Sequence, residues 1–124
     1  MRVINKHIIH CSDSEVGDVK LIRQWHIERG WQDVGYHFII RRDGEIEVGR
    51  TLEEMGAHCQ GQNADSIGTC LVGVRDFTPG QFAALKRVHG MVRSLFPGVR
   101  VFNHCQFNAG KTCPNFDAHD ILGE

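Results

Sequence analysis

The sequence predicts a single α/β domain, spanning residues 1–124, in which helices flank a central mixed β-sheet. The first observation is that short apolar segments rich in β-branched residues alternate along the chain with two segments of helical spacing. The second is composition, because 41% hydrophobic and 23% charged residues are ordinary for a globular protein and exclude general disorder. A chain of this length can bury about two-thirds of its unfolded surface, so its core needs no covalent cross-links.

The first elements expected are a strand and a helix. The strand ends near His10, and its apolar residues are Val3, Ile4, Ile8 and Ile9. The range 17–29 predicts an amphipathic helix with an apolar stripe formed by Leu21, Ile22, Trp25 and His26. Asp18 suits the first turn of this helix, and Gly30 suits the left-handed conformation that often follows a helix end.

The middle of the chain predicts a hairpin and a buried strand. Residues 36–42 and 45–49 flank Asp43-Gly44, a dipeptide typical of a two-residue β-turn. Residues 67–74 form a nearly continuous apolar run that is short for a helix. This run therefore predicts a central strand that is buried on both faces.

The last third begins with a strong helix start. Residues 78–81, Thr-Pro-Gly-Gln, supply an N-cap, a proline at the first helical position and the glutamine of a capping box. The apolar positions that follow at helical spacing are Phe82, Leu85, Val88 or His89, Val92 and Phe96. Pro97-Gly98 ends the helix, and residues 99–103 predict the last strand. An irregular loop to Pro114 and a short helix near the end complete the expected order.

Charge, cysteine usage and hydropathy exclude several classes of protein. Fifteen acidic and fourteen basic residues give a net charge of −1, so no general attraction to nucleic acid or to a membrane surface is expected. Five cysteines without regular spacing do not indicate a disulfide framework. Because neither a signal-peptide core nor a run of about 20 apolar residues is present, we expect a protein that is made in the cytoplasm and remains there.

The candidate metal-binding residues are His10, His104 and Cys113. Both histidines follow predicted strands, where α/β sheets usually present their binding groups, and Cys113 comes nine positions after His104. Two imidazoles and one thiolate match a catalytic zinc set that leaves a fourth position for water, whose pKa zinc lowers toward about 7. Since neither HExxH nor CxxC spacing is present, these residue types alone leave a structural role open.

The remaining histidines and cysteines favour structural roles. His26 is expected to be packed on its helix, and His37, next to Tyr36 on a strand, to point to the opposite face. The side chains predicted to be surface or interface groups are His7, His89 and His119. The cysteines predicted to be buried without a functional role are Cys11, Cys70 and Cys105.

The order of several segments resembles a known enzyme family. These segments are IIHCS, IRQWHIERGWQDVGYHFIIRRDGEIEVGR, GAHCQG, SIGTCLVG and KTCPNFD, which together run from about residue 8 to residue 117. They resemble the zinc-dependent N-acetylmuramoyl-L-alanine amidases, whose fold is shared with peptidoglycan-recognition proteins. Within that family the likeness is greatest to the small amidase-type lysozymes of T-odd coliphages.

The resemblance implies roles for particular residues. It implies one Zn²⁺ per chain, with His10, His104 and Cys113 as ligands. Tyr36 and Lys111 fall on the family's catalytic positions. The segment containing His58 is similar to one that lines the family's substrate cleft, so His58 is expected either to contact the substrate or to lie at the surface. The sequence departs from the family at Gln106, where an acidic residue is often found, and by one extra residue between His104 and Cys113.

The implied activity is hydrolysis of the amide bond between N-acetylmuramic acid and L-alanine in peptidoglycan. The resemblance further implies a phage endolysin that is made in the host cytoplasm, acts on periplasmic peptidoglycan and is a monomer. One alternative is a module that binds muropeptides without cutting them, although such relatives commonly lack the ligand cysteine that Cys113 supplies here. Another is a regulator of phage RNA polymerase, a second role of the coliphage relatives.

Overall fold

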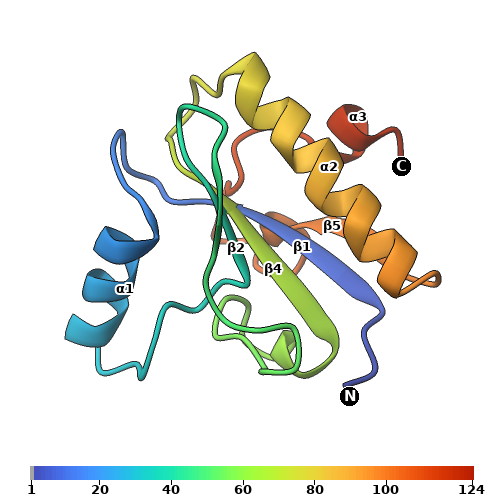
Figure 1. Cartoon of the computed structure of the whole chain (residues 1–124), viewed down its shortest axis with the longest axis horizontal. Helices are drawn as coiled ribbons and strands as arrows, with labels where there is room; N and C mark the ends of the chain where they lie inside the picture. The colour runs from blue at the N-terminus through green and yellow to red at the C-terminus, as the bar shows by residue number, and fades with distance from the viewer. Residues whose placement is uncertain (1) are drawn as a thin grey trace.

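A five-stranded mixed β-sheet forms the centre of the molecule (Figure 1). The computed structural model describes residues 2–124, so Met1 of the predicted domain lies outside the described residues. The strands are β1 Lys6–Cys11, β2 Phe38–Ile40, β3 Ile46–Val48, β4 Ser66–Leu71 and β5 Arg100–Asn103. Their order across the sheet is β3-β2-β4-β1-β5, so the apolar β4 is the central strand, as predicted.

Parallel pairing brings the ends of distant segments together. Strand β1 pairs in parallel with both β4 and β5, and β2 pairs in parallel with β4. His10 lies opposite Cys70 in this register, and Ile9 lies opposite Asn103. The carboxyl ends of β1 and β5 therefore meet at one edge of the sheet. Only β3 is antiparallel, as the second arm of the predicted hairpin.

Local signals define the helices. Helix α1, Val19–Glu28, begins after Asp18, whose side chain accepts a hydrogen bond from the backbone N–H of Leu21. Helix α2, Pro79–Leu95, begins with the complete capping box of Thr78 and Gln81. The short helix α3 spans Ala118–Leu122, and two 3₁₀ turns are η1, Asn63–Asp65, and η2, His104–Gln106.

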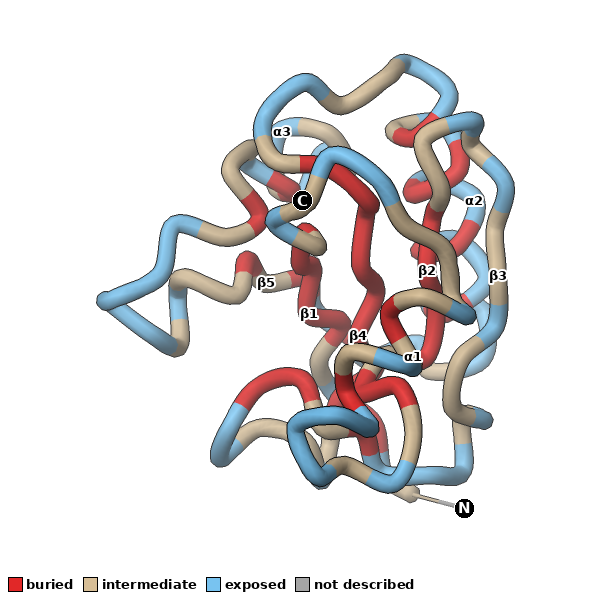
Figure 2. Tube along the Cα trace, turned by 90° about the vertical axis from the view of Figure 1, so that its left-hand side faces the viewer, coloured by how far each residue is buried: buried red, intermediate tan, exposed pale blue. Residues whose placement is uncertain are grey.

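Two apolar layers enclose the sheet. Figure 1 shows α2 and α3 on one side of the sheet and α1 on the other. The larger layer joins Ile9 and Ile40 to Leu85 and Val92 of α2, and the smaller joins Ile39 to Ile22 of α1. Consecutive strand residues thus pack into opposite layers. Figure 2 shows the buried central strands beneath exposed connecting segments.

No helix within residues 2–124 has the length and apolar character needed to cross a membrane.

The predictions for three side chains are wrong. His7 is 0% exposed and His89 3% exposed, whereas both were expected at the surface. Their rings stack with centroids 5.2 Å apart, and their Nδ1 atoms are 2.9 Å apart. Thr69 and Glu124 provide the outer hydrogen bonds of this pair, so burial leaves no ring nitrogen without a partner. Cys105 is only half-buried, because it lies in the η2 turn rather than in a strand.

Candidate active site

A cleft of about 500 Å³ opens at the carboxyl ends of β1 and β5. All the site residues predicted from the sequence line it: His10, Tyr36, His58, His104, Lys111 and Cys113. Other residues that the sequence analysis did not assign to a site also line the cleft, among them His26, Arg29 and Trp31. A cation and an indole ring therefore form part of its wall.

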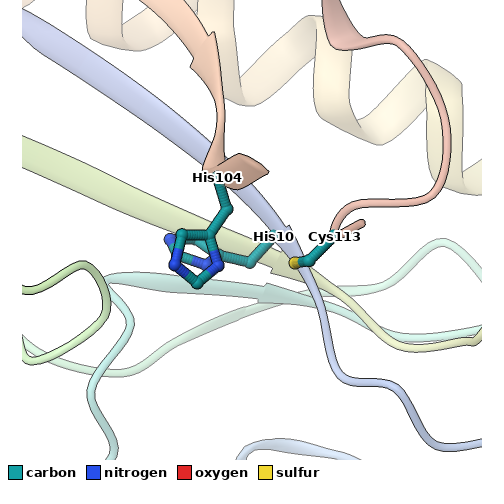
Figure 3. A group of neighbouring side chains, drawn as sticks. All are labelled: His10, His104 and Cys113. Carbon is teal, nitrogen blue, oxygen red and sulfur yellow. The ribbon is translucent and has the colours of Figure 1, made fainter. Parts of the chain in front are cut away.

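His10, His104 and Cys113 converge within the cleft. Figure 3 shows the two imidazole rings and the sulfur close together, His10 on β1, His104 just after β5 and Cys113 on the following loop. One ligand atom from each residue lies within 4.8 Å of the others, and the ring centroids of His10 and His104 are 4.4 Å apart. Donor atoms at these separations can surround one metal ion.

The chemistry of these donors fits a divalent cation. Nδ1 of His104 is buried and has no hydrogen-bond partner among residues 2–124, which is costly unless a ligand satisfies it. Burial lowers the pKa of His10 well below its ordinary value, so its ring is the neutral form that binds metals. The neighbouring Cys11 thiol and burial raise the pKa of Cys113, whereas the backbone N–H of Cys11, which donates to its Sγ at 3.0 Å, favours the thiolate. A coordinated metal ion deprotonates such a thiol outright. Nitrogen and sulfur donors together favour zinc over magnesium or calcium.

His58 contacts a predicted ligand directly. Its Nδ1 is 2.8 Å from Nε2 of His10, and its Nε2 is 3.1 Å from Oγ of Ser66. The contact with His58 occupies Nε2 of His10, so Nδ1 is the ring nitrogen of His10 that has no hydrogen-bond partner among residues 2–124. A Cβ added to Gly68 would lie 2.6 Å from the His58 ring, so the glycine makes room for this contact. In the sequence, this glycine of the SIGTC segment indicates that another group packs closely against the strand, although it does not identify His58 as that group.

Tyr36 and Lys111 flank the three donors. The Tyr36 ring centroid is 5.1 Å from that of His10, and burial raises the pKa of its phenol, which stays protonated and can donate a hydrogen bond. Lys111 is exposed at the rim. Burial and the positive charge of Lys111 together lower the pKa of His104, which places this ammonium within electrostatic range of the donor set.

Comparison with known protein families shows which of them this chain matches. The chain matches the model of the N-acetylmuramoyl-L-alanine amidase family over residues 1–116. The chain belongs to this family. It is an N-acetylmuramoyl-L-alanine amidase, the hydrolase class that cleaves the amide bond between N-acetylmuramic acid and L-alanine in peptidoglycan.

Relatives of the amidase include phage endolysins. The endolysin of Enterobacteria phage K11 is 45% identical over 125 residues, covering 91% of this chain and 82% of its own. The endolysin of Escherichia phage T7 is 42% identical over 120 residues, covering 88% and 79%. Among solved structures, N-acetylmuramoyl-L-alanine amidase LysC from Clostridium intestinale superposes with a TM-score of 0.92 at 28% identity, covering 98% of this chain and 85% of that one. The family and fold implied by the resemblance are thus confirmed.

Proposed function

We propose that this amidase is a zinc-dependent phage endolysin that binds one zinc ion through His10, His104 and Cys113. The observation that carries the proposal is the convergence of these three donors, within 4.8 Å of one another, in the cleft of an amidase-family chain. The buried Nδ1 of His104, which has no hydrogen-bond partner in the part of the chain that the structure describes, supports it further. The endolysin relatives, similar to this chain over most of their length, support a role in degrading the host wall.

Zinc bound at this site would polarise the scissile carbonyl and increase the acidity of the attacking water. The chain's own residues then have separate tasks. The Lys111 ammonium, at the rim beside His104, stabilises the negative charge that develops on the carbonyl oxygen as the tetrahedral state forms. The protonated phenol of Tyr36 orients the water or donates a proton. His58 holds the ring of His10 through their 2.8 Å contact.

The cleft suits a muropeptide substrate. It is open to solvent and large enough to hold the lactyl and alanyl groups on either side of the scissile bond. Arg29 and Trp31, which line the cleft, offer a cation and an aromatic face for the peptide or the sugar. Cys113 favours hydrolysis over a binding-only role, because a thiolate completes the three-donor set that catalytic zinc sites use.

Digestion of purified peptidoglycan tests this proposal. The expected products are new free amines on L-alanine without any increase in reducing sugar, because an amide and not a glycosidic bond is cut. Metal analysis should find one zinc per chain in the wild type and a large loss in Cys113→Ala. An increase in reducing sugar would indicate a glycosidase, and undiminished zinc in Cys113→Ala would refute the ligand assignment.

A further inference from the structure

The two histidine donors of the amidase are held in different ways. His10 is fixed through its ring, because Nε2 contacts Nδ1 of His58 at 2.8 Å. A histidine that binds a metal usually has such a partner on its second ring nitrogen, which sets the ring orientation. His104, in contrast, forms no hydrogen bond within residues 2–124 through either ring nitrogen: its buried Nδ1 is left for the proposed metal ion, and its Nε2 has no partner that would orient the ring. The placement of His104 therefore depends strongly on the backbone that carries it.

That backbone is the short turn η2, which starts at His104 immediately after β5. Asn103 is the N-cap residue of the turn, and Gln106 is its last residue. The backbone N–H of Asn103 donates to Oε1 of Gln106 at 2.8 Å. This hydrogen bond spans the turn that carries His104 and fixes the direction in which its side chain leaves the sheet.

The same asparagine ties the turn to the C-terminal helix. Its Nδ2 donates to Oδ1 of Asp117 at 3.1 Å, and its Oδ1 accepts from the backbone N–H of Ala118 at 2.9 Å. Asp117 is the N-cap of α3, and its Oδ1 also accepts from the backbone N–H of His119. The hydrogen bond from Asn103 holds the pKa of the Asp117 carboxyl below its ordinary value, so the acceptor stays ionised.

A second link runs parallel to the first. The ring nitrogen Nε2 of His119 lies 2.8 Å from Oε1 of Gln106, the same oxygen that accepts from Asn103. The first turn of α3 thus contacts both ends of η2. Helix α3 is itself anchored by apolar packing, since Ala118 is fully buried and Ile121 and Leu122 pack against the larger apolar layer.

We propose that Asn103 is a positioning residue for His104 and that it acts together with Asp117, so that α3 sets the direction of a metal ligand it does not touch. This inference rests on the proposed zinc site. The network compensates for the absence of a hydrogen bond to the second ring nitrogen of His104 within residues 2–124, because it holds Asn103 and Gln106, the residues at either end of the turn, in place. Loss of the Asn103–Asp117 contact then weakens metal binding more than it weakens the fold, because apolar contacts still hold α3 in place.

Zinc affinity measured on the full-length protein tests the proposal. The metal-free wild type, Asn103→Ala, Asp117→Ala and Asp117→Asn are titrated with zinc against a chromogenic chelator. The two alanine variants should bind zinc about 10- to 100-fold more weakly. Asp117→Asn should remain near the wild type, because an amide oxygen can accept the same two hydrogen bonds and asparagine is a good N-cap.

Two further measurements separate positioning from general stability. Absorption of the cobalt-substituted protein reports the coordination geometry directly, and it should change in Asp117→Ala but not in Asp117→Asn. Thr78→Ala is the matched control, because it removes the N-cap of α2, away from the cleft. Its zinc affinity should equal that of the wild type even though its melting temperature falls.

Asp117→Ala with wild-type zinc affinity and an unchanged cobalt spectrum would overturn the inference, as would an equal loss of affinity in Thr78→Ala. If Asn103→Ala does not fold, the comparison of the two Asp117 variants decides the question. Failure of the zinc proposal itself looks different: zinc would then bind Cys113→Ala as tightly as the wild type. That result would remove the basis of the positioning role as well.

Discussion

Tyr36 and Lys111, the two side chains that flank the three donors, differ in exposure and in the catalytic role proposed for each. Tyr36 is partly buried against His10, while Lys111 is exposed at the rim of the cleft. Neither residue belongs to the donor set. Both can therefore be replaced without removing a donor, which makes their catalytic roles separable from metal binding.

Lys111→Ala and Tyr36→Phe are expected to lower turnover while zinc content and melting temperature stay near those of the wild type. Loss of one group that stabilises the oxyanion typically lowers kcat by about 10²- to 10³-fold. Loss of proton-transfer assistance lowers it by about 10²- to 10⁴-fold. Amine release from peptidoglycan and metal analysis of the same preparations provide the measurement. Near-wild-type turnover in Lys111→Ala would mean that the lysine side chain does not stabilise the oxyanion.

His58→Ala should reduce zinc affinity by about 10- to 100-fold, because the ring of His10 loses the contact that orients it. Ser66→Ala removes only the far hydrogen bond of His58 and should have a smaller effect. Chelator competition measures both. Unchanged zinc affinity in His58→Ala combined with a raised KM would instead support the substrate contact predicted from the sequence.

Helix α2 and the β2–β3 hairpin form where the local sequence contains strong capping and turn signals. Helix α2 begins where Thr78, Pro79 and Gln81 satisfy its first backbone N–H groups. The hairpin of β2 and β3 turns at Gly44, whose φ of 84° is in the left-handed region. Backbone hydrogen bonds of the hairpin continue beyond the ends of the two strands, for example from the N–H of Arg50 to the carbonyl of Tyr36. The two arms predicted from the sequence are longer than the strands, and these hydrogen bonds account for part of the difference.

Thr78→Ala is expected to lower the free energy of unfolding by about 1 kcal/mol, because the side chain that accepts from the backbone N–H of Gln81 is lost. For a chain of this size, that loss corresponds to a decrease in melting temperature of about 4 °C. Thermal unfolding followed by circular dichroism measures it. An unchanged melting temperature would show that Gln81, which also contacts the carbonyl of Val72, anchors the helix start without the threonine.

The limit of sequence-based prediction lies at contacts between distant elements. That His10, His104 and Cys113 lie near one another could be predicted, because strand ends and residue types are local features and the family resemblance selects among them. The His7–His89 pair could not, since it joins β1 to α2 across 82 positions and buries two polar rings that look like surface groups. The contact of His58 with His10, and the links from Asn103 to α3, likewise depend on the folded arrangement of remote segments.

At the scale of the whole molecule, the buried histidines make stability depend on pH. Burial lowers the pKa of His26 and of His37 to about 4, and lowers that of His7 well below its ordinary value. The ordinary value in an unfolded chain is about 6.5, so below it the unfolded state binds more protons than the folded state. The stabilisation is therefore complete above pH 6.5 and is lost as the pH falls toward 4.

Urea unfolding of the zinc-free protein at pH 7.5, 6 and 5 should show this loss. Each histidine that stays neutral in the folded state contributes a slope of up to about 1.4 kcal/mol per pH unit. The midpoint urea concentration is expected to decrease steadily below pH 6.5. A midpoint that stays constant or increases from pH 7.5 to pH 5 would contradict the buried, neutral state of these rings.

The contact between the backbone N–H of Cys11 and the sulfur of Cys113 joins positions 102 apart, and it has a consequence for synthesis. A ribosome makes His10 94 positions before His104 and 103 positions before Cys113. Throughout that interval the nascent polypeptide carries one imidazole of the proposed zinc site and neither of the other two donors. Contacts of such long range also form slowly. A product whose synthesis stops before Cys113 would lack the complete donor set, and hence the metal site on which the proposed mechanism depends.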